Sequence, residues 1–216
     1  MFKIENLIVE NVLEIKDLEL HGSVVSIEGQ SGSGKSTLLR LLNNLDSPKS
    51  GTIYYEDESL TKMNPMELRR NIVMVPQEPV VFDGTIRDNL LIGLTFSGQD
   101  KATDSSLKDI LEKLWLEDKK LDTSASDLSG GEKQRLTLAR VLLMKKANVF
   151  LLDEPASSLD DETTEHVLNE FINQAKEQQI IMVTHDKRVS YQYADQKINM
   201  DDYSVRLKHG VHHNGK

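Results

Sequence analysis

The first fifty residues carry apolar and polar positions in short, regular patterns separated by turns. Apolar and polar residues alternate at positions 1–6, which is the period of a half-buried β-strand, and residues 4–9 and 13–20 read as short strands. Residues 24–28 form a shorter apolar run that enters a glycine-rich loop, and residues 37–42 then read as an apolar helix. The pattern predicts two initial strands followed by a strand, loop and helix unit.

A helical region separates two stretches in which strands and helices alternate. Residues 51–55 and 72–75 are predicted strands, and Asn64 followed by Pro65 predicts a helix start between them. From residue 85 to about residue 127 the pattern is helical, with a shared apolar face made by Leu107, Ile110, Leu111, Leu114 and Trp115. We expect this stretch to be a helical insertion that is entered and left through polar loops.

Strands and helices alternate again after this region. Predicted helices at about residues 132–146 and around residues 167–172 alternate with predicted strands at residues 148–152 and 180–183. This order favours an α/β sheet. We predict one domain over residues 1–208, with its helical part at about residues 85–145, and a disordered tail at residues 209–216.

Charge and composition narrow the classes of function. The net charge of -9 argues against broad binding of nucleic-acid backbones, so we expect no nucleic-acid partner. The lack of cysteine excludes disulfides and thiolate metal sites, and it suits a reducing cytoplasm. No signal-peptide pattern opens the chain, and no apolar run approaches the roughly 20 residues that span a bilayer. If the protein works at a membrane, we expect another chain to supply the spanning helices.

A glycine-rich loop joins the third predicted strand to the helix that follows it. It fits the pattern G-x-x-x-x-G-K-[ST] with Gly29, Gln30, Ser31, Gly32, Ser33, Gly34, Lys35 and Ser36. Glycines let backbone N–H groups turn onto phosphate oxygens, and the helix N-terminus, which includes Thr37, adds a partial positive charge. Lys35 would reach the outer phosphates and Ser36 would offer its hydroxyl to Mg²⁺. The loop therefore predicts a site for nucleotide phosphates.

Two acidic residues follow the apolar strand at residues 148–152. Asp153 can lie beside the phosphate loop and hold Mg²⁺. Glu154 is one residue later and points elsewhere, where it can orient or deprotonate the water that attacks the γ-phosphorus. Taken alone, this pair is equally compatible with an ordinary turn at a strand end.

A third segment makes the catalytic interpretation specific. Residues 128–135 read LSGGEKQR, and their glycines open a predicted helix whose N-terminus is a second anion-binding site. One γ-phosphate does not need two such sites on one chain. Lying between a phosphate loop and an Asp-Glu strand end, residues 128–134 resemble the signature motif of ATP-binding-cassette (ABC) domains.

Further motifs follow in the order found in ABC domains. Gln77 resembles the Q-loop residue, residues 157–160 (SSLD) resemble the D-loop, and His185 resembles the switch histidine. The resemblance covers nearly the whole chain, from about residue 2 to 208. It implies an α/β fold, in which a P-loop NTPase core with a mixed sheet carries an N-terminal antiparallel β-subdomain and a small α-helical insertion subdomain.

The resemblance also implies a composite active site for Mg-dependent hydrolysis of ATP. The implied catalytic residues are Glu154, His185, Gln77 and Lys35, and the implied Mg²⁺ ligands are Ser36, Gln77 and Asp153. ATP would contact residues 29–37 of one subunit, while the signature motif of a second copy would close the site in a head-to-tail homodimer. The remaining nucleotide-binding residues implied by the family are Ser129, Gly130, Gly131 and Asp160.

Residues 76–90 resemble the Q-loop region of exporter-type ABC domains, which receives the membrane subunit. Val80, Val81 and Phe82 fit such a docking surface, and they fit equally well a role in packing the helical region against the core. The resemblance implies a cytoplasmic subunit at the inner face of the cell membrane, bound to a separate transmembrane permease, of a metal, iron or other exporter. The alternative is a soluble ABC ATPase without transport, of the iron–sulfur assembly type.

The sequence departs from the family where adenine is held. Many ABC domains stack adenine on an aromatic residue that precedes the phosphate loop, and that position falls near residues 9–12 here. No aromatic residue occurs between Phe2 and Tyr54. Because weaker stacking lowers base discrimination, we predict that GTP competes with ATP better than it does in domains that have the aromatic residue.

Overall fold

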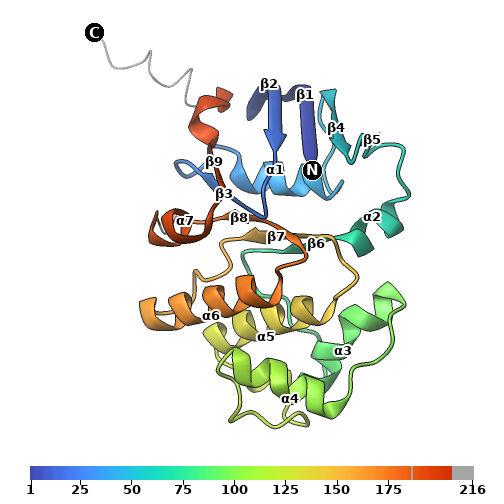
Figure 1. The fold of residues 1–216 in the computed structure, drawn as a ribbon, viewed down its shortest axis with the longest axis vertical. Coiled ribbons are helices and arrows are strands. Elements are labelled where there is room, and N and C mark those ends of the chain that lie inside the picture. Colours follow the sequence, from blue (N-terminus) through green and yellow to red (C-terminus); the bar gives the residue numbers. More distant parts are fainter. Residues whose placement is uncertain (186, 206–216) are drawn as a thin grey trace.

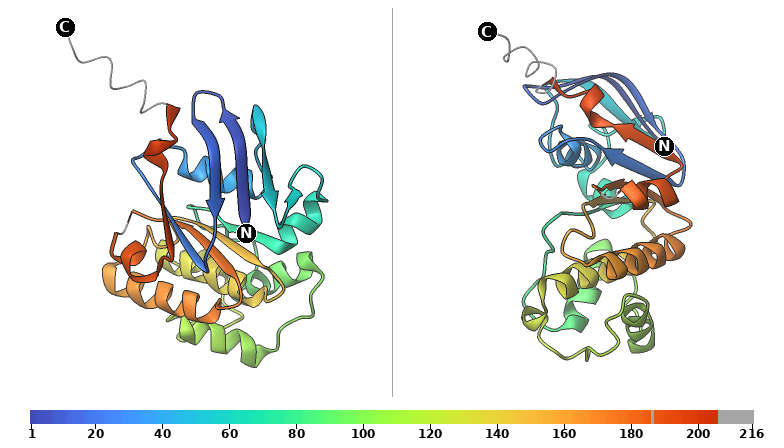
Figure 2. Two further views of the ribbon diagram at one scale, coloured as in Figure 1. Left: turned by 45° about the horizontal axis from the view of Figure 1, so that its top comes forward. Right: turned by 90° about the vertical axis from the view of Figure 1, so that its left-hand side faces the viewer.

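The protein is built in layers around a central β-sheet, as the computed structural model of residues 1–185 and 187–205 shows (Figure 1). The tail predicted at residues 209–216 lies outside the described residues. One side of the central sheet carries a second sheet and helix α1 (Lys35–Leu42), and most of the other helices cover the opposite side (Figure 2). Within the described ranges, no helix combines the length and the apolar character needed to cross a membrane.

The second sheet is antiparallel and comes mostly from the N-terminal part of the chain. Its strand order is β2-β1-β4-β5, with bounds β1 Phe2–Val9, β2 Leu13–Leu20, β4 Ser50–Tyr55 and β5 Glu58–Ser59. Phe2 pairs with Leu20 on one side and with Tyr55 on the other. Most apolar positions of the two predicted strands are buried, because one face of this sheet packs on α1 and the central sheet, whereas Ile8 is 41% exposed.

The central sheet has the order β6-β7-β8-β3-β9. Its strands are β3 (Val24–Glu28), β6 (Ile72–Val75), β7 (Val149–Asp153), β8 (Gln179–Val183) and β9 (Gln196–Asn199). All of the described pairings are parallel, so the mixed sheet expected from the sequence is corrected to a parallel one. The strands of the other sheet pair antiparallel, which short turns between neighbouring strands allow.

Strand β7 explains why the chain has two separate apolar cores. All five of its residues are buried, because layers cover both faces of the central sheet. Val149 and Leu151 belong to the core around α1 and the second sheet, whereas Phe150 and Leu152 belong to the core beneath the helices. Each of these side chains contributes about 1.5–3 kcal/mol by leaving water, and the strand fixes the sheet between the two layers.

The helices on the far side of the sheet begin and end where local capping dictates. They are α3 (Ile86–Ser97), α4 (Asp104–Lys113), α5 (Gly130–Leu143) and α6 (Asp161–Gln174), while α2 (Pro65–Asn71) and α7 (Lys187–Tyr193) are short connecting helices. Helix α5 begins at Gly130 rather than near residue 132 because Ser129 caps it, and it ends at Leu143 rather than 146. Helix α1 begins at Lys35 instead of Thr37, so two residues of the phosphate loop are helical.

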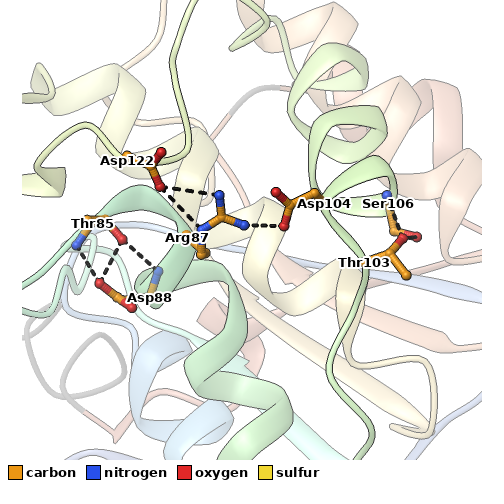
Figure 3. Close-up of polar contacts among 7 residues, drawn as sticks. All are labelled: Thr85, Arg87, Asp88, Thr103, Asp104, Ser106 and Asp122. Carbon is orange, nitrogen blue, oxygen red and sulfur yellow. Dashed lines mark hydrogen bonds and ion pairs between the residues drawn. The ribbon is translucent and has the colours of Figure 1, made fainter.

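Polar contacts hold the start of α3 against α4 and the loop before α5 (Figure 3). Thr85 and Asp88 form a capping box, and the Asp88 carboxylate accepts hydrogen bonds from the Thr85 amide at 2.8 Å and hydroxyl at 2.7 Å. Arg87 pairs with Asp104 at the start of α4 and with Asp122, whose Oδ1 lies 3.2 Å from Arg87 Nη2. The guanidinium therefore joins three chain segments through one side chain.

Candidate active site

The phosphate loop connects β3 to α1 with the backbone that its glycines were expected to supply. Gly29, Gly32 and Gly34 have φ angles of 142°, 79° and 100°, which other residues adopt only with strain. A Cβ atom on Gly34 would also lie 2.5 Å from Leu13 Cδ2. The glycines therefore allow both the turn into α1 and the close approach of the β2 strand.

Lys35 and Ser36 open α1 and point into the loop. The Lys35 ammonium donates to the carbonyl oxygens of Gly29 and Gln30, both at 2.9 Å, and this side chain is only 6% exposed. The Ser36 hydroxyl donates to Asp153 Oδ1 at 3.1 Å. Hydrogen bonds within the chain thus fix the positions of both side chains.

The Ser36–Asp153 pair fits a magnesium ion. A hydroxyl and a carboxylate supply the oxygen ligands that Mg²⁺ prefers, and phosphates and waters ordinarily complete its shell. Asp153 is 5% exposed, and this burial raises the pKa of its carboxyl, while the hydrogen bond from Ser36 opposes the shift. A cation at this position would offset the desolvation of the carboxylate.

Glu154 lies at the centre of the other predicted catalytic residues. Its Oε2 accepts a hydrogen bond from Gln77 Nε2 at 3.2 Å, and its Oε1 lies 2.9 Å from His185 Nε2. The residue has a φ of 47°, a left-handed conformation, and its amide donates to the Val183 carbonyl at 3.0 Å. The carboxylate is therefore held by side chains from two other loops.

A hollow of about 290 Å³ brings these groups together. The lining residues are Val12, Ser31, Gly32, Gly34, Lys35, Ser36, Thr37, Gln77, Glu154 and His185. Nine of the predicted site residues thus face one space with the loop's amides, next to the Ser36–Asp153 pair. Of the remaining loop residues, Ser33 is fully buried, and Gly29 and Gln30 lie under Asp201.

The predicted signature residues do not line this hollow. Ser129 caps α5, with its hydroxyl accepting from the Glu132 amide at 3.4 Å, and both Ser129 and Gly130 are exposed. Gly131 lies close to the D-loop, since a Cβ atom there would be 3.2 Å from the Ser158 carbonyl oxygen. The second anion-binding helix start is thus presented to solvent, apart from the phosphate loop of the same chain.

Asp160 was predicted to bind the nucleotide, and within its own subunit it has a structural role. It caps α6, and its carboxylate accepts from the Thr163 amide at 2.9 Å and the Thr163 hydroxyl at 2.8 Å. These hydrogen bonds lower the pKa of Asp160, with the backbone bond from Thr163 as the largest cause. The carboxylate therefore turns toward its own helix, and it is absent from the residues that line the hollow.

Sequence reasoning missed Asp201, which supports the phosphate loop from the far end of the chain. It lies in the 3₁₀ helix Met200–Asp202 after β9, and its Oδ1 accepts from the Gln30 amide at 2.8 Å. The only available signal was an acid shortly after the strand that pairs with β3. Val12, which lies in the segment where many ABC domains have the adenine-stacking aromatic residue, lines the hollow.

An apolar cleft of about 500 Å³ lies on a different face, beside α3. Val80 and Phe82 line it and are 44% and 39% exposed, whereas Val81 packs against the core under the helices. Arg140 supports the cleft wall by donating to the Val80 carbonyl at 2.9 Å and lying 5.0 Å above the Phe82 ring. Of the two roles left open for residues 80–82, packing is thus observed for Val81, and docking stays a prediction for Val80 and Phe82.

Comparison with known proteins finds extensive similarity. The family described as "ABC transporter" matches residues 17–157. The chain is 37% identical over 192 residues to "Probable iron export ATP-binding protein FetA" of Escherichia coli (strain K12), covering 87% of this chain and 83% of that protein. It is 36% identical over 189 residues to "Protein STAR1" of Oryza sativa subsp. japonica, covering 86% of this chain and 54% of that protein.

The fold is also found among solved structures. "Structure of a bacterial Atm1-family ABC exporter with ATP bound" superposes with a TM-score of 0.83 at 26% identity, covering 99% of this chain and 40% of that one. The chain spans about half the length of curated relatives such as the Oryza protein.

Proposed function

This chain belongs to the ABC transporter family, and we propose that it is an ATP-binding subunit that hydrolyses ATP with Mg²⁺ to drive a separate membrane permease. The observation that carries the proposal is the Glu154 carboxylate, held between Gln77 and His185 in the hollow that the phosphate loop lines. Phosphoryl transfer to water needs such a base beside an anion-binding loop and an Mg²⁺-compatible pair of ligands.

In the proposed reaction, the loop amides and Lys35 hold the phosphates, and Glu154 orients the attacking water. As the water oxygen bonds to the γ-phosphorus, its proton passes to the Glu154 carboxylate and the bond to the ADP oxygen breaks. Gln77 and His185 keep the carboxylate aimed while the water approaches. Mg²⁺ held by Ser36 and Asp153 would neutralise charge on the phosphates.

The proposal includes a head-to-tail homodimer. Ser129 and Gly130 cap and open α5 at the surface and do not line the hollow of their own chain. The free N–H groups at an exposed helix N-terminus can bind a phosphate. A second copy supplies such a phosphate on its own loop, so two copies close two equivalent sites.

We propose that the apolar cleft beside α3 receives the permease. Phe96, Val80 and Phe82 line it and are 68%, 44% and 39% exposed, and exposed apolar patches of this kind mark interaction surfaces. The cargo is selected by the permease, because ATP hydrolysis itself carries no information about it. The name of the Escherichia coli relative supports iron or another metal as exported cargo.

The test is co-purification of the tagged protein from its native cells in mild detergent, with wild type compared against Phe96→Glu and Tyr191→Glu. Tyr191 is 75% exposed but lies outside the cleft, so its variant controls for an added surface charge. We expect a polytopic membrane protein to accompany the wild type and the Tyr191 variant, and to be lost with Phe96→Glu. Recovery of soluble scaffold proteins alone would support the iron–sulfur assembly alternative, and equal recovery with all three would refute the cleft.

A further inference from the structure

A buried glutamine connects three of the site's motifs. Gln134 lies in the second turn of α5, the helix that begins at the signature residues, and it is 2% exposed. Its Nε2 donates to the backbone carbonyl of Glu154 at 3.1 Å, and its Oε1 accepts from the backbone amide of Ser158 at 3.0 Å. Both ends of one amide are thus occupied by the backbone of the catalytic strand end and of the D-loop.

Glu154, whose carbonyl accepts from Gln134, has an unfavourable backbone conformation. Glu154 has a φ of 47°, a conformation that residues other than glycine keep only when their surroundings determine it. Its carbonyl accepts from Gln134 and from the Ser157 amide at 3.2 Å, while its own amide is tied to Val183. The Glu154 side chain leaves the Cα atom that lies between this amide and this carbonyl. Fixing both groups therefore determines where the carboxylate points.

The start of α5 packs closely on the segment that Gln134 also holds. A Cβ atom on Gly131 would be 3.1 Å from Leu159 Cδ2 and 3.2 Å from the Ser158 carbonyl oxygen, so the two backbones are nearly in contact. The start of α5 is therefore connected to residues 157–159 by packing and to Glu154 through the Gln134 amide.

We propose that Gln134 is a positioning residue that couples the signature end of α5 to the general base of the same subunit. This inference rests on the proposed ATPase and its homodimer. When the phosphates of ATP on the second subunit contact Ser129 and Gly130, the Gln134 amide transmits the resulting shift of α5 to the Glu154 backbone. Hydrolysis in one site then depends on the occupancy of the other.

The test compares Gln134→Met with Gln178→Met. Methionine keeps the length of the side chain and removes both hydrogen bonds. Gln178 is also buried, at 7% exposure, but its amide reaches the Lys145 carbonyl far from the site, so it controls for the loss of a buried glutamine. Steady-state hydrolysis, ATP affinity by direct binding, and thermal midpoint are measured for each.

We expect Gln134→Met to lower kcat about 10- to 100-fold, the effect of slight misplacement of a catalytic group, with the ATP dissociation constant within about twofold of wild type. The dependence of rate on ATP concentration is expected to lose its cooperativity. Gln178→Met is expected to keep the wild-type kcat and cooperativity even if its thermal midpoint falls. A folded Gln134→Met protein with wild-type kcat and cooperativity overturns the inference, and so does an equal loss in both variants.

Gln134→Glu provides a second test that survives if the methionine variant does not fold. Its carboxylate still accepts from the Ser158 amide but donates to Glu154 only when protonated. The ratio of its kcat to that of wild type is therefore expected to rise as pH falls. A ratio that is near one at every pH overturns the inference, whereas an inactive wild type would instead refute the proposed function.

Discussion

The strongest test of the site is Glu154→Gln, because the contacts allow its effect on chemistry to be separated from its effect on structure. The glutamine amide can present its oxygen to Gln77 Nε2 and its NH₂ group to His185 Nε2, the partners now at 3.2 and 2.9 Å. The second contact requires the imidazole to carry its proton on Nδ1. The hollow and the phosphate loop should thus keep their geometry, and only the proton acceptor is lost.

The expected magnitude follows from that loss. A positioned general base contributes about 10²–10⁴-fold to a rate, which corresponds to about 3–5 kcal/mol of transition-state stabilisation. We therefore expect kcat to fall by at least a hundredfold, while the ATP dissociation constant changes by less than about threefold. Bound ATP that is not consumed should accumulate in a long-lived homodimer.

The assay is release of inorganic phosphate together with direct ATP binding, and gel filtration with Mg²⁺ and ATP reports the dimer. Glu78→Gln is the matched control, since Glu78 is exposed, close to Gln77 in sequence, and does not line the hollow. It should keep wild-type turnover. Undiminished hydrolysis by Glu154→Gln would refute the base assignment, and equal loss of hydrolysis and ATP binding would show that the carboxylate has a structural role.

Three further predictions concern residues around this centre. Replacing Val12 with Tyr is expected to raise the preference for ATP over GTP in competition binding, because Val12 lines the hollow where stacking was expected; an unchanged ratio would contradict this. Asp201→Ala is expected to weaken ATP binding about tenfold, because the Gln30 amide loses its acceptor. Asp201→Asn should restore most of that affinity and Asp202→Ala should have none of the effect, so equal weakening by Asp202→Ala would contradict it. Glu132 has a pKa lowered to about 2, first by its hydrogen bond with Lys119. Its carboxylate therefore stabilises the fold fully above its ordinary value of 4.5, and this stabilisation is lost as pH falls toward 2. The thermal midpoint of Glu132→Gln should consequently fall less between pH 6 and 2.5 than that of wild type, and parallel curves would refute the assignment.

Local patterns determined most of the elements, because the physics that forms them is local. The apolar run at residues 148–152 predicted a buried strand, and β7 is buried at every position. The errors in the predicted helix boundaries have local causes as well. Ser129 caps α5 with its hydroxyl, so the helix includes the two glycines that follow, and the spacing of apolar residues does not reveal this cap. The pairing direction of the central strands was less accessible, since it depends on which distant strands become neighbours.

The structure brings predicted site residues together where a motif determines its own geometry. Residues 31, 32 and 34–37 line the hollow because loop and helix are contiguous, and Gln77, Glu154 and His185 meet there because parallel strands end at one edge of the sheet. Asp160 and Asp201 show the limit of this reasoning. The first has a local helix to cap, and the second reaches Gln30 only through the order in which β9 joins the sheet.

The alternation along β7 also determines on which side of the sheet Asp153 lies. Odd-numbered positions of this strand face α1, and even-numbered positions face the helices of the opposite layer. Asp153 therefore lies on the same side of the sheet as Ser36. Glu154 does not follow this alternation, because it lies beyond the last residue of β7 and has a φ of 47°, and it lines the same hollow as Ser36. Deleting one residue from β7 would leave an equally apolar strand, yet it would turn Asp153 to the opposite face of the sheet, away from Ser36.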